Sequence, residues 1–466
     1  MLDTESPPAH HPRMRADRTE SAPTRLGAGY WKLWTASVTS NLGDGISTVA
    51  YPWLASAVTR DPIQIAGIAV ATRLPWLIFT LPAGVITDRL DRRKIIIAMD
   101  VARMLITVGV AVSVLVLGGD LVTPDDPVAA AAERPEHGLA LLIVLYGSAL
   151  LFGFAEVLRD NAAQTILPSI VDAEQLETAN GRMWGAEMVM NSFVGPPLGG
   201  VLIAIGFSIP FFVDAGTFGV AAVLIAAIGG ARLQPESPPA GRKGFRAELA
   251  EGIGWLWNHR LLKRMGIILG VMNGTFAAAM AVYVLFVQEI LGLDASSFGL
   301  LLTGGAIGGV IGSVAAARVS RAIGPGASLF SVLLAGAVTL GITGTTSSAL
   351  VVWAMFVLFS FSAVLWNVIT VSLRQTIIPD ELLGRVNSVY RFLAWGMMPI
   401  GSILGGVAVS ITEALSTRSL GLRMPFLIGA VVHLGLYLYA RPVLNTANIE
   451  AAKAEATAHR SEPAEQ

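Results

Sequence analysis

Three ionisable side chains lie deep inside long apolar stretches of the sequence. Asp44 and Arg73 fall near the middle of two consecutive stretches, residues 31–58 and 63–86, and Asp214 lies six residues into a later one. Charge inside an apolar environment is costly, so these residues are candidates for function. Because Asp44 and Arg73 have opposite charges, we expect them to interact, and we hypothesise that a proton on Asp44 removes this attraction and favours a second conformation. The alternative is a static buried pair that only fixes packing.

Further charged residues lie near the ends of the apolar stretches. Asp100 and Arg103 are three positions apart on one helix face, so we expect them to form a structural pair. Glu156 and Asp160 are candidate partners for the arginines of a basic loop that precedes Asp100. Asp214 is a candidate second proton site, and the alternative is a hydrogen-bonded carboxylate at a helix end.

The composition indicates what kind of protein must position these charges. Hydrophobic residues make up 53% of the 466 residues and charged residues only 14%, whereas soluble domains carry about 25% charged residues. A helix that crosses a bilayer needs about 20 mostly apolar residues. The sequence therefore predicts an all-α membrane protein with twelve transmembrane helices. These are expected at residues 31–58, 63–86, 95–117, 139–158, 180–205, 208–230, 263–290, 296–317, 326–346, 348–372, 384–411 and 424–441.

The positions of lysine and arginine predict the topology. If the N-terminus is cytoplasmic, 26 of the 32 Lys and Arg residues fall in inner segments, 4 fall in outer loops, and Arg73 and Arg103 lie inside helices. Lysine and arginine are enriched on the cytoplasmic side of membrane proteins. We therefore expect an even number of helices, both termini in the cytoplasm and a location in the cell membrane.

The chain repeats itself at half its length. Residues 164–168 read QTILP and residues 375–379 read QTIIP, and each is followed by an acidic connector and a glycine-spaced helix. Two six-helix halves in the same orientation, residues 31–230 and 263–441, explain this parallel repeat, which is typical of transporters built from two halves.

Polar segments complete the predicted organisation. Residues 1–30 and 442–466 are expected to be disordered cytoplasmic tails, and we interpret the first as a tail and not as a signal peptide. Residues 231–262 are expected to be a cytoplasmic linker between the halves. Within it, residues 245–259 are amphipathic and are expected to lie along the inner membrane surface. The alternative for this stretch is a soluble connector helix.

Several motifs resemble those of the major facilitator superfamily. The loop at residues 84–94 reads GVITDRLDRRK and resembles the superfamily signature at the same position, with Asp91 where glycine is common. Residues 195–200 read GPPLGG and resemble the glycine–proline motif of drug:proton antiporters. Residues 41–45 and 210–218 look like the branch that holds enterobactin-type and macrolide-type exporters. The resemblance covers residues 31–441 and implies the two-half fold, a monomer, and no cofactor.

The resemblance also implies roles for particular residues. In the family, the signature loop and its charged partners act as a latch between the halves, and topogenic charge is the alternative. The latch residues in this sequence are Gly84, Asp88, Arg89, Arg92, Arg93, Asp100, Arg103, Glu156 and Asp160. The glycine–proline motif is expected to bend a helix and shape the cavity, although plain helix packing explains it equally. Its residues are Gly195, Pro196, Gly199 and Gly200.

Amide, aromatic and methionine side chains in the apolar stretches are candidates to line a substrate cavity. Apolar walls with few polar groups suit bulky amphipathic molecules, and methionine adapts to varied shapes. Helical phase does not decide which of these side chains face a cavity and which face lipid or a neighbouring helix. The candidates are Asn41, Met188, Asn191, Asn273, Phe276, Trp366 and Asn367.

These observations favour a transporter over other classes of membrane protein. The expected function is proton-coupled export of a hydrophobic or amphipathic small molecule, a drug or a siderophore-like metabolite. The alternative is an importer or facilitator of a small polar solute. The expected partners are this substrate, protons and membrane lipid. The sequence shows no metal-ligand spacing, phosphate loop or cysteine, and the net charge of −1 does not suggest a nucleic-acid partner.

Overall fold

The computed structural model describes residues 26–119, 121, 135–228 and 245–461, and these ranges contain helices but no strand. The first half contains α1 (Ala28–Val58), α2 (Pro62–Ile78), α3 (Thr80–Arg89), α4 (Arg92–Leu117), α6 (Gly138–Ile166), α7 (Leu176–Met188), the π-helix Val189–Val194, α8 (Gly195–Ile205) and α9 (Ile209–Ala226). The later helices are α10 (Phe245–Asn258), α11 (Arg260–Ala281), α12 (Tyr283–Glu289), α13 (Ala295–Ile323), α14 (Pro325–Thr345), α15 (Ala349–Ile377), α16 (Asp380–Leu415), α17 (Arg418–Ala440) and α18 (Thr446–Ser461). Short 3-10 turns at Leu167–Ser169 and Ala173–Gln175 join α6 to α7.

Helices cover each of the twelve apolar stretches except for a few described residues at their ends, but three stretches are interrupted. The stretch at 63–86 breaks at Phe79 into α2 and α3, and the one at 263–290 breaks at Val282 into α11 and α12. The stretch at 180–205 passes through the π-helix before α8. Proline explains the break after α2, because Pro82 has no N–H to donate to the carbonyl of Ile78 and its ring would clash with that carbonyl in a continuous helix.

Ten helical segments in the described chain are long and apolar enough to cross a membrane, with α7 to α8 counted as one. These ten include neither α1 nor α2, which is a shorter apolar helix of 17 residues. The residues that lower the hydropathy of α1 include Ser40, Asn41 and Asp44, which belong to the polar interior of the first half. The structure thus gives an all-α multi-span protein, and the count of twelve stays a prediction.

Side-chain caps determine where several helices begin. Asp91 accepts hydrogen bonds from the backbone N–H groups of Arg93 and Lys94 and so caps α4. An acidic N-cap satisfies free backbone donors and interacts favourably with the helix dipole. Asp91 therefore has a structural role at the position where the superfamily signature commonly has glycine. Asp61 caps α2 in the same way.

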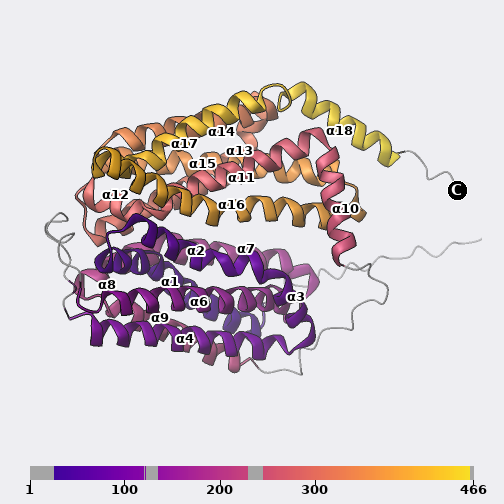
Figure 1. Ribbon diagram of the computed structural model, residues 1–466. Helices are drawn as coiled ribbons and strands as arrows, with labels where there is room; N and C mark the ends of the chain where they lie inside the picture. Colours follow the sequence, from indigo (N-terminus) through magenta and orange to yellow (C-terminus); the bar gives the residue numbers. More distant parts are fainter. Residues whose placement is uncertain (1–25, 120, 122–134, 229–244, 462–466) are drawn as a thin grey trace, which may run out of the picture.

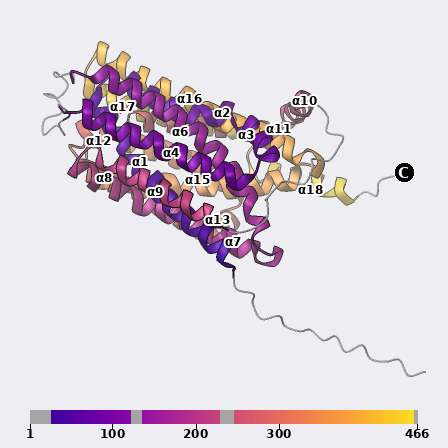
Figure 2. The same cartoon turned by 90° about the horizontal axis from the view of Figure 1, so that it is seen from below.

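The helices form two bundles that lie side by side (Figure 1). Helices α1 to α9, coloured indigo to magenta, make one bundle, and α11 to α17, coloured pink to yellow, make the other. Helices α3, α10 and α18 lie at one end of the molecule and α8 and α12 at the other (Figure 2). We call the end with α12 the outer end and the end with α18 the inner end, following the topology that lysine and arginine predict.

Three buried cores hold the helices together, and their distribution is uneven. One core at the outer end joins both halves, through Val49, Trp53, Phe211, Tyr283, Phe286, Phe298 and Phe426. Toward the inner end each half has its own core, around Tyr30, Ile96 and Ile166 in the first half and around Leu262, Trp366 and Tyr390 in the second. Among the described residues, the halves are therefore united most extensively at the outer end.

Candidate functional site

A buried arginine from α4 is the partner of Asp44. Arg103 Nη1 lies 3.5 Å from Asp44 Oδ1, and Arg103 Nη2 donates to Ser40 Oγ at 3.1 Å. The predicted pair between Asp44 and Arg73 is wrong in this conformation, because the side chain of Arg73 is exposed on α2. Helix α1 packs mainly against α8 and α9 and touches α2 little, so consecutive helices do not bring these two charges together.

The charges continue from Arg103 toward the inner end. Asp100 Oδ1 lies 2.5 Å from Arg103 Nη2 and 3.4 Å from Arg159 Nε on α6. Arg159 Nη1 lies 3.4 Å from Asp160 Oδ1. The predicted pair of Asp100 and Arg103 is confirmed. We call the series Asp44–Arg103–Asp100–Arg159–Asp160 the charge chain; it connects α1, α4 and α6.

Aromatic rings surround the cation at the centre of the charge chain. The Arg103 guanidinium lies 4.2 Å from the ring centre of Phe218 on α9 and 5.6 Å from that of Phe152 on α6. Only 1% of the Arg103 side chain is exposed. Burial removes the hydration of a guanidinium, which costs free energy, and neighbouring carboxylates and aromatic faces offset this cost. Arg103 therefore depends on both of its acids, and a change in either one must affect the other.

Asp214 of α9 lies near the charge chain and contacts α1. Ser47 Oγ donates to Asp214 Oδ2 at 2.6 Å, and Thr217 Oγ1 lies 3.5 Å from Asp214 Oδ1. The close approach requires glycine at position 43, because a Cβ atom there would overlap the oxygens of Asp214 and Thr217. Asp214 is thus a fully buried, hydrogen-bonded carboxylate. Its role as a second proton site stays a prediction.

The signature loop connects α3 to α4 at the inner end. Arg93 Nε donates to the carbonyl of Ile225 at 3.2 Å, and its guanidinium also donates to the carbonyl of Ala226, so this residue holds the end of α9. The side chains of Asp88 and Arg89 lie outside the described part of the chain. No atom lies within 4 Å of a Cβ atom placed on Gly84. The role of the signature loop as a latch between the halves stays a prediction.

The two acids of α6 have partners other than those expected. Glu156 Oε2 accepts a hydrogen bond from Trp76 Nε1 on α2 at 3.3 Å, and Asp160 pairs with the neighbouring Arg159. Sequence reasoning counted Arg159 only as an inner-side cation. Its spacing from Glu156 and Asp160, within one helical turn, was the signal that could have marked it as a site residue.

The glycine–proline motif brings three helices into backbone contact. A Cβ atom on Gly195 would lie 2.5 Å from Gly45 Cα of α1, and one on Gly199 would lie 2.6 Å from the carbonyl oxygen of Ile46. A Cβ atom on Gly200 would overlap the carbonyl oxygen of Ala295, at the start of α13 in the other half. Pro196 is the second residue after the π-helix, which ends at Val194. The structure thus shows close helix packing by this motif, and its effect on leakage stays a prediction.

The candidate cavity residues lie in different environments. Asn41 is buried and donates to Ser37 of its own helix, and Asn273 donates to the carbonyl of Ala394 at 2.9 Å between α11 and α16. Trp366 is only 1% exposed within the inner core of the second half, so it does not face an open cavity here. Asn367 is exposed, and Met188 and Asn191 are partly exposed around the π-helix.

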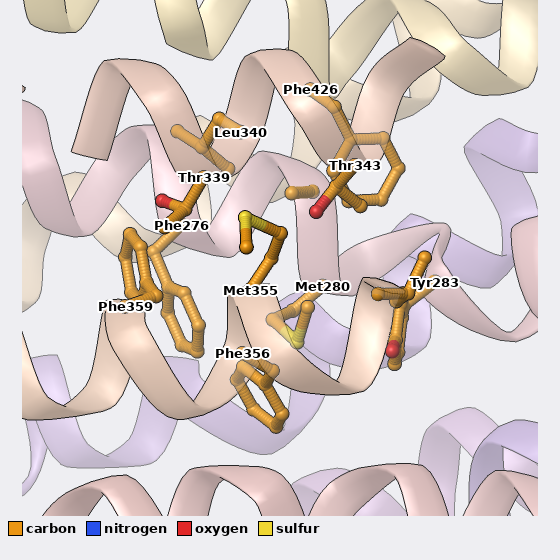
Figure 3. A pocket seen from close by; sticks show the side chains of 12 residues that line it. Phe276, Met280, Tyr283, Thr339, Leu340, Thr343, Met355, Phe356, Phe359 and Phe426 are labelled. Atoms are coloured by element: carbon orange, nitrogen blue, oxygen red, sulfur yellow. The ribbon is translucent and has the colours of Figure 1, made fainter. Parts of the chain in front are cut away.

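Phe276 lines an aromatic pocket inside the second half (Figure 3). Side chains from α11, α12, α14, α15 and α17 surround it, including Met280, Tyr283, Met355 and Phe359. The rings of Phe276 and Phe359 stack with centres 5.3 Å apart and an angle of 13° between their planes. The cavity has a volume of about 30 Å³, whereas sites for drug-sized ligands have about 300–1,000 Å³. The pocket can admit a bulky apolar group only after its side chains move.

A family comparison agrees with the two-bundle fold. A sequence model of the Major Facilitator Superfamily matches residues 33–402. The chain belongs to this superfamily. It is a multi-span membrane transporter and not an enzyme, and the predicted family membership is confirmed.

Characterised relatives include exporters. The multidrug efflux pump Tap of Mycolicibacterium fortuitum is 28% identical over 408 residues, which cover 85% of this chain and 93% of that protein. The enterobactin exporter EntS of Citrobacter koseri is 23% identical over 380 residues, covering 81% and 84% of the two chains. A bacterial homologue of the human lysosomal transporter Spinster, solved in an inward-facing and unoccupied conformation, superimposes with a TM-score of 0.64 at 13% identity, covering 94% of this chain and 98% of that one.

Proposed function

We propose that this protein exports a hydrophobic or amphipathic small molecule across the cell membrane in exchange for protons, by alternating access. The charge chain carries the proposal, because Arg103 is shared between Asp44 and Asp100, which come from different helices. Similarity to Tap over nearly the whole length of both chains supports the direction of transport. The substrate is a drug or a siderophore-like metabolite.

The coupling step is a proton transfer at Asp44. In the outward-open state, the Asp44 carboxylate takes up a proton from the outside and loses its charge. Arg103 then keeps only Asp100 as its ionic partner, so α1 is no longer held to α4 by the ion pair at 3.5 Å. This change favours the inward-open state, where the proton leaves to the cytoplasm. The other charged groups near Asp44 are Glu156, Arg159, Asp160 and Asp214.

The substrate passes between apolar walls in this proposal. The aromatic pocket around Phe276 offers stacked rings and two methionines to a hydrophobic group, and methionine side chains can repack around varied shapes. A small polar solute would find few polar partners there. This pocket therefore favours the exporter over an importer of polar solutes.

The proposed topology has twelve spans and both termini in the cytoplasm. The start of α1 and the helix α18 lie at the same end of the molecule, which supports an even number of crossings (Figure 2). The amphipathic helix α10 lies at that end too, with Ile253 and Trp257 exposed, as expected for a helix on the inner membrane surface. The proposed working unit is a monomer.

Accumulation of lipophilic compounds in cells tests the proposed function. Cells that express the protein and cells with an empty vector are loaded with fluorescent dyes, macrolides and tetracyclines, with and without a protonophore. The proposal predicts lower accumulation of at least one compound in expressing cells, and a protonophore must abolish the difference. A reduction that survives collapse of the proton gradient would overturn proton coupling, and uptake driven by the protein would overturn export.

A further inference from the structure

Helices α10 and α18, which lie at the inner end of the molecule (Figure 1), border a large cavity. Its volume is about 1010 Å³, at the upper limit of the roughly 300–1,000 Å³ of small-molecule sites. Every residue that lines it belongs to one of three segments, residues 255–261, 377–381 and 443–456. All three lie in the second half or in the helix just before it. The cavity is therefore not part of the boundary between the halves, and it shares no residue with the aromatic pocket around Phe276.

Each of the two helices is anchored to the second half by contacts of its own. On α10, Leu256 is fully buried in the inner core, and Glu251 Oε2 accepts a hydrogen bond from Arg385 Nη1 of α16 at 2.8 Å. On α18, Ile449 is fully buried in the same core. The walls of the cavity are therefore in place before any ligand binds, as is usual for small-molecule sites.

Among the described side chains that line the cavity, carboxylates outnumber cations. Glu381 and Glu455 contribute two negative charges, and Arg260 contributes one positive charge. His259 is neutral in this arrangement, because its Nδ1 accepts a hydrogen bond from the N–H of Leu262 at 3.3 Å and must be unprotonated to do so. Burial also lowers the pKa of His259, which favours the neutral ring. The charge balance of the cavity therefore favours a cation as its ligand.

Aromatic and aliphatic side chains form much of the remaining wall. The rings of Trp255 and His259 have centres 5.2 Å apart and an angle of 32° between their planes. Leu261, Ile377 and Val443 add aliphatic surface. A cation is attracted to the face of a tryptophan ring, and an apolar body gains free energy by leaving water for aliphatic surface. These walls therefore suit a cation that carries an apolar body.

We infer that this cavity is a binding site for an amphipathic organic cation, separate from the route between the halves. The charged group of the ligand lies beside Glu381 and Glu455, and its apolar body lies against Trp255 and the aliphatic wall. A ligand in this position contacts α10 and α18 at once and so stabilises the inner end of the second half. The inference does not depend on the proposed export of a substrate.

Protection of an introduced cysteine from alkylation tests the site. The chain contains no cysteine, so the variants Ala451→Cys and Ala454→Cys each carry a single thiol. Both positions are exposed on α18, but of the two only Ala451 lines the cavity. The rate of alkylation by N-ethylmaleimide is measured on the purified full-length protein during a titration with ethidium, a flat aromatic cation. Fluorescein, a flat aromatic anion, is titrated in parallel.

Ethidium is expected to protect the thiol inside the cavity. At about ten times its dissociation constant it leaves the site empty about one-eleventh of the time, so alkylation of Ala451→Cys is expected to slow about tenfold. Ala454→Cys is the matched control and is expected to react at the same rate with and without ethidium. Fluorescein is expected to protect neither thiol.

A double variant tests the two carboxylates. Glu381→Gln combined with Glu455→Gln, in the Ala451→Cys background, keeps the size of both side chains and removes both charges. The ethidium concentration that gives half-maximal protection is expected to rise about tenfold. Glu450→Gln is the control for charge on the same helix, because Glu450 pairs with Lys453 at 2.9 Å and does not line the cavity.

The possible outcomes separate this site from the proposed function. Absence of protection by ethidium, with unchanged circular dichroism, would overturn the inference, and so would equal protection of Ala454→Cys or equal protection by fluorescein. An unchanged half-maximal concentration in the double variant would overturn the role of the carboxylates. Protection by short-chain phosphatidylethanolamine but not by ethidium would overturn the organic cation in favour of a lipid headgroup. Because the assay measures binding alone, protection supports the site even if the protein exports none of the tested compounds.

Discussion

At the scale of single residues, Arg103 is the cation on which the charge chain depends. Its guanidinium contacts Asp44, Asp100 and Ser40 within a cage that includes Phe218. The sequence marks Asp44, Asp100 and Arg103 as charges in apolar stretches. Their pairing depends on which helices are spatial neighbours and on how each helix is rotated. Because α1 packs on α9 and not along α2, the sequence order pointed to the wrong partner, Arg73.

The first prediction concerns the removal of this cation. Arg103→Gln leaves the buried Asp100 without its closest cation and is expected to lower the free energy of unfolding by about 3–5 kcal/mol, as for other broken buried pairs. Thermal unfolding of the purified protein in detergent measures this loss. Arg321→Gln is the control, since Arg321 is exposed and its guanidinium bonds to the carbonyl of Ala317 in its own helix. Equal melting temperatures for the two variants would contradict the central place of Arg103.

The second prediction separates the two buried carboxylates beside α1. Asp214→Asn keeps an oxygen that can accept the hydrogen bond from Ser47, so the local packing is expected to be preserved. If the coupled proton binds at Asp44 and not at Asp214, transport by this variant keeps the wild-type dependence on pH. The rate of export is measured between pH 5.5 and 8.5 in wild type and variant. If the variant loses the pH dependence instead, Asp214 carries a coupled proton and Asp44 is not the sole coupling site.

At the scale of helices, the sequence predicts the apolar stretches well but not their interruptions. Helices cover all twelve stretches except at some of their described ends, and proline accounts for the break at Phe79. No sequence signal marked the break at Val282 or the π-helix before Gly195, which packs against another helix. Gly45, for example, packs against the carbonyls of the π-helix. The helix-5 glycines are visible in the sequence as a motif, but only the structure shows that Gly199 and Gly200 face different halves of the protein.

The third prediction follows from that difference. Gly199→Ala places a Cβ atom against the backbone of Ile46 within the first half and is expected to cost about 1–3 kcal/mol of stability by overpacking. Gly200→Ala pushes against Ala295 of the other half, so it is expected to separate the outer ends. The separation is measured by pulsed electron paramagnetic resonance as a longer distance between spin labels on Leu139→Cys, at the start of α6, and Leu350→Cys, at the start of α15, both of which are exposed. Gly216→Ala is the control for both, because nothing lies within 4 Å of a Cβ atom there. A longer distance in Gly199→Ala but not in Gly200→Ala would contradict this assignment.

At the scale of the whole molecule, α1 carries both the charge chain and a contact between the halves. Asp44 lies in the charge chain, and Ser56 accepts a hydrogen bond from Gln288 of the second half at 2.9 Å. The two residues are 12 positions apart on α1, or about 18 Å along its axis. The sequence predicts the two-half architecture through its internal repeat. It does not predict that Ser56 and Gln288 meet, because only the folded chain brings these two segments together.

The central claim is that a proton on Asp44 is exchanged for substrate. Transport measured under an imposed pH gradient tests this claim most directly. The protein is reconstituted into liposomes, and flux of a compound identified by the accumulation assay is measured with and without a pH gradient. Wild-type flux is predicted to rise when the gradient drives protons opposite to the substrate, while Asp44→Asn exchanges substrate at a rate that the gradient does not change. A variant that responds to the gradient as the wild type does would contradict the claim.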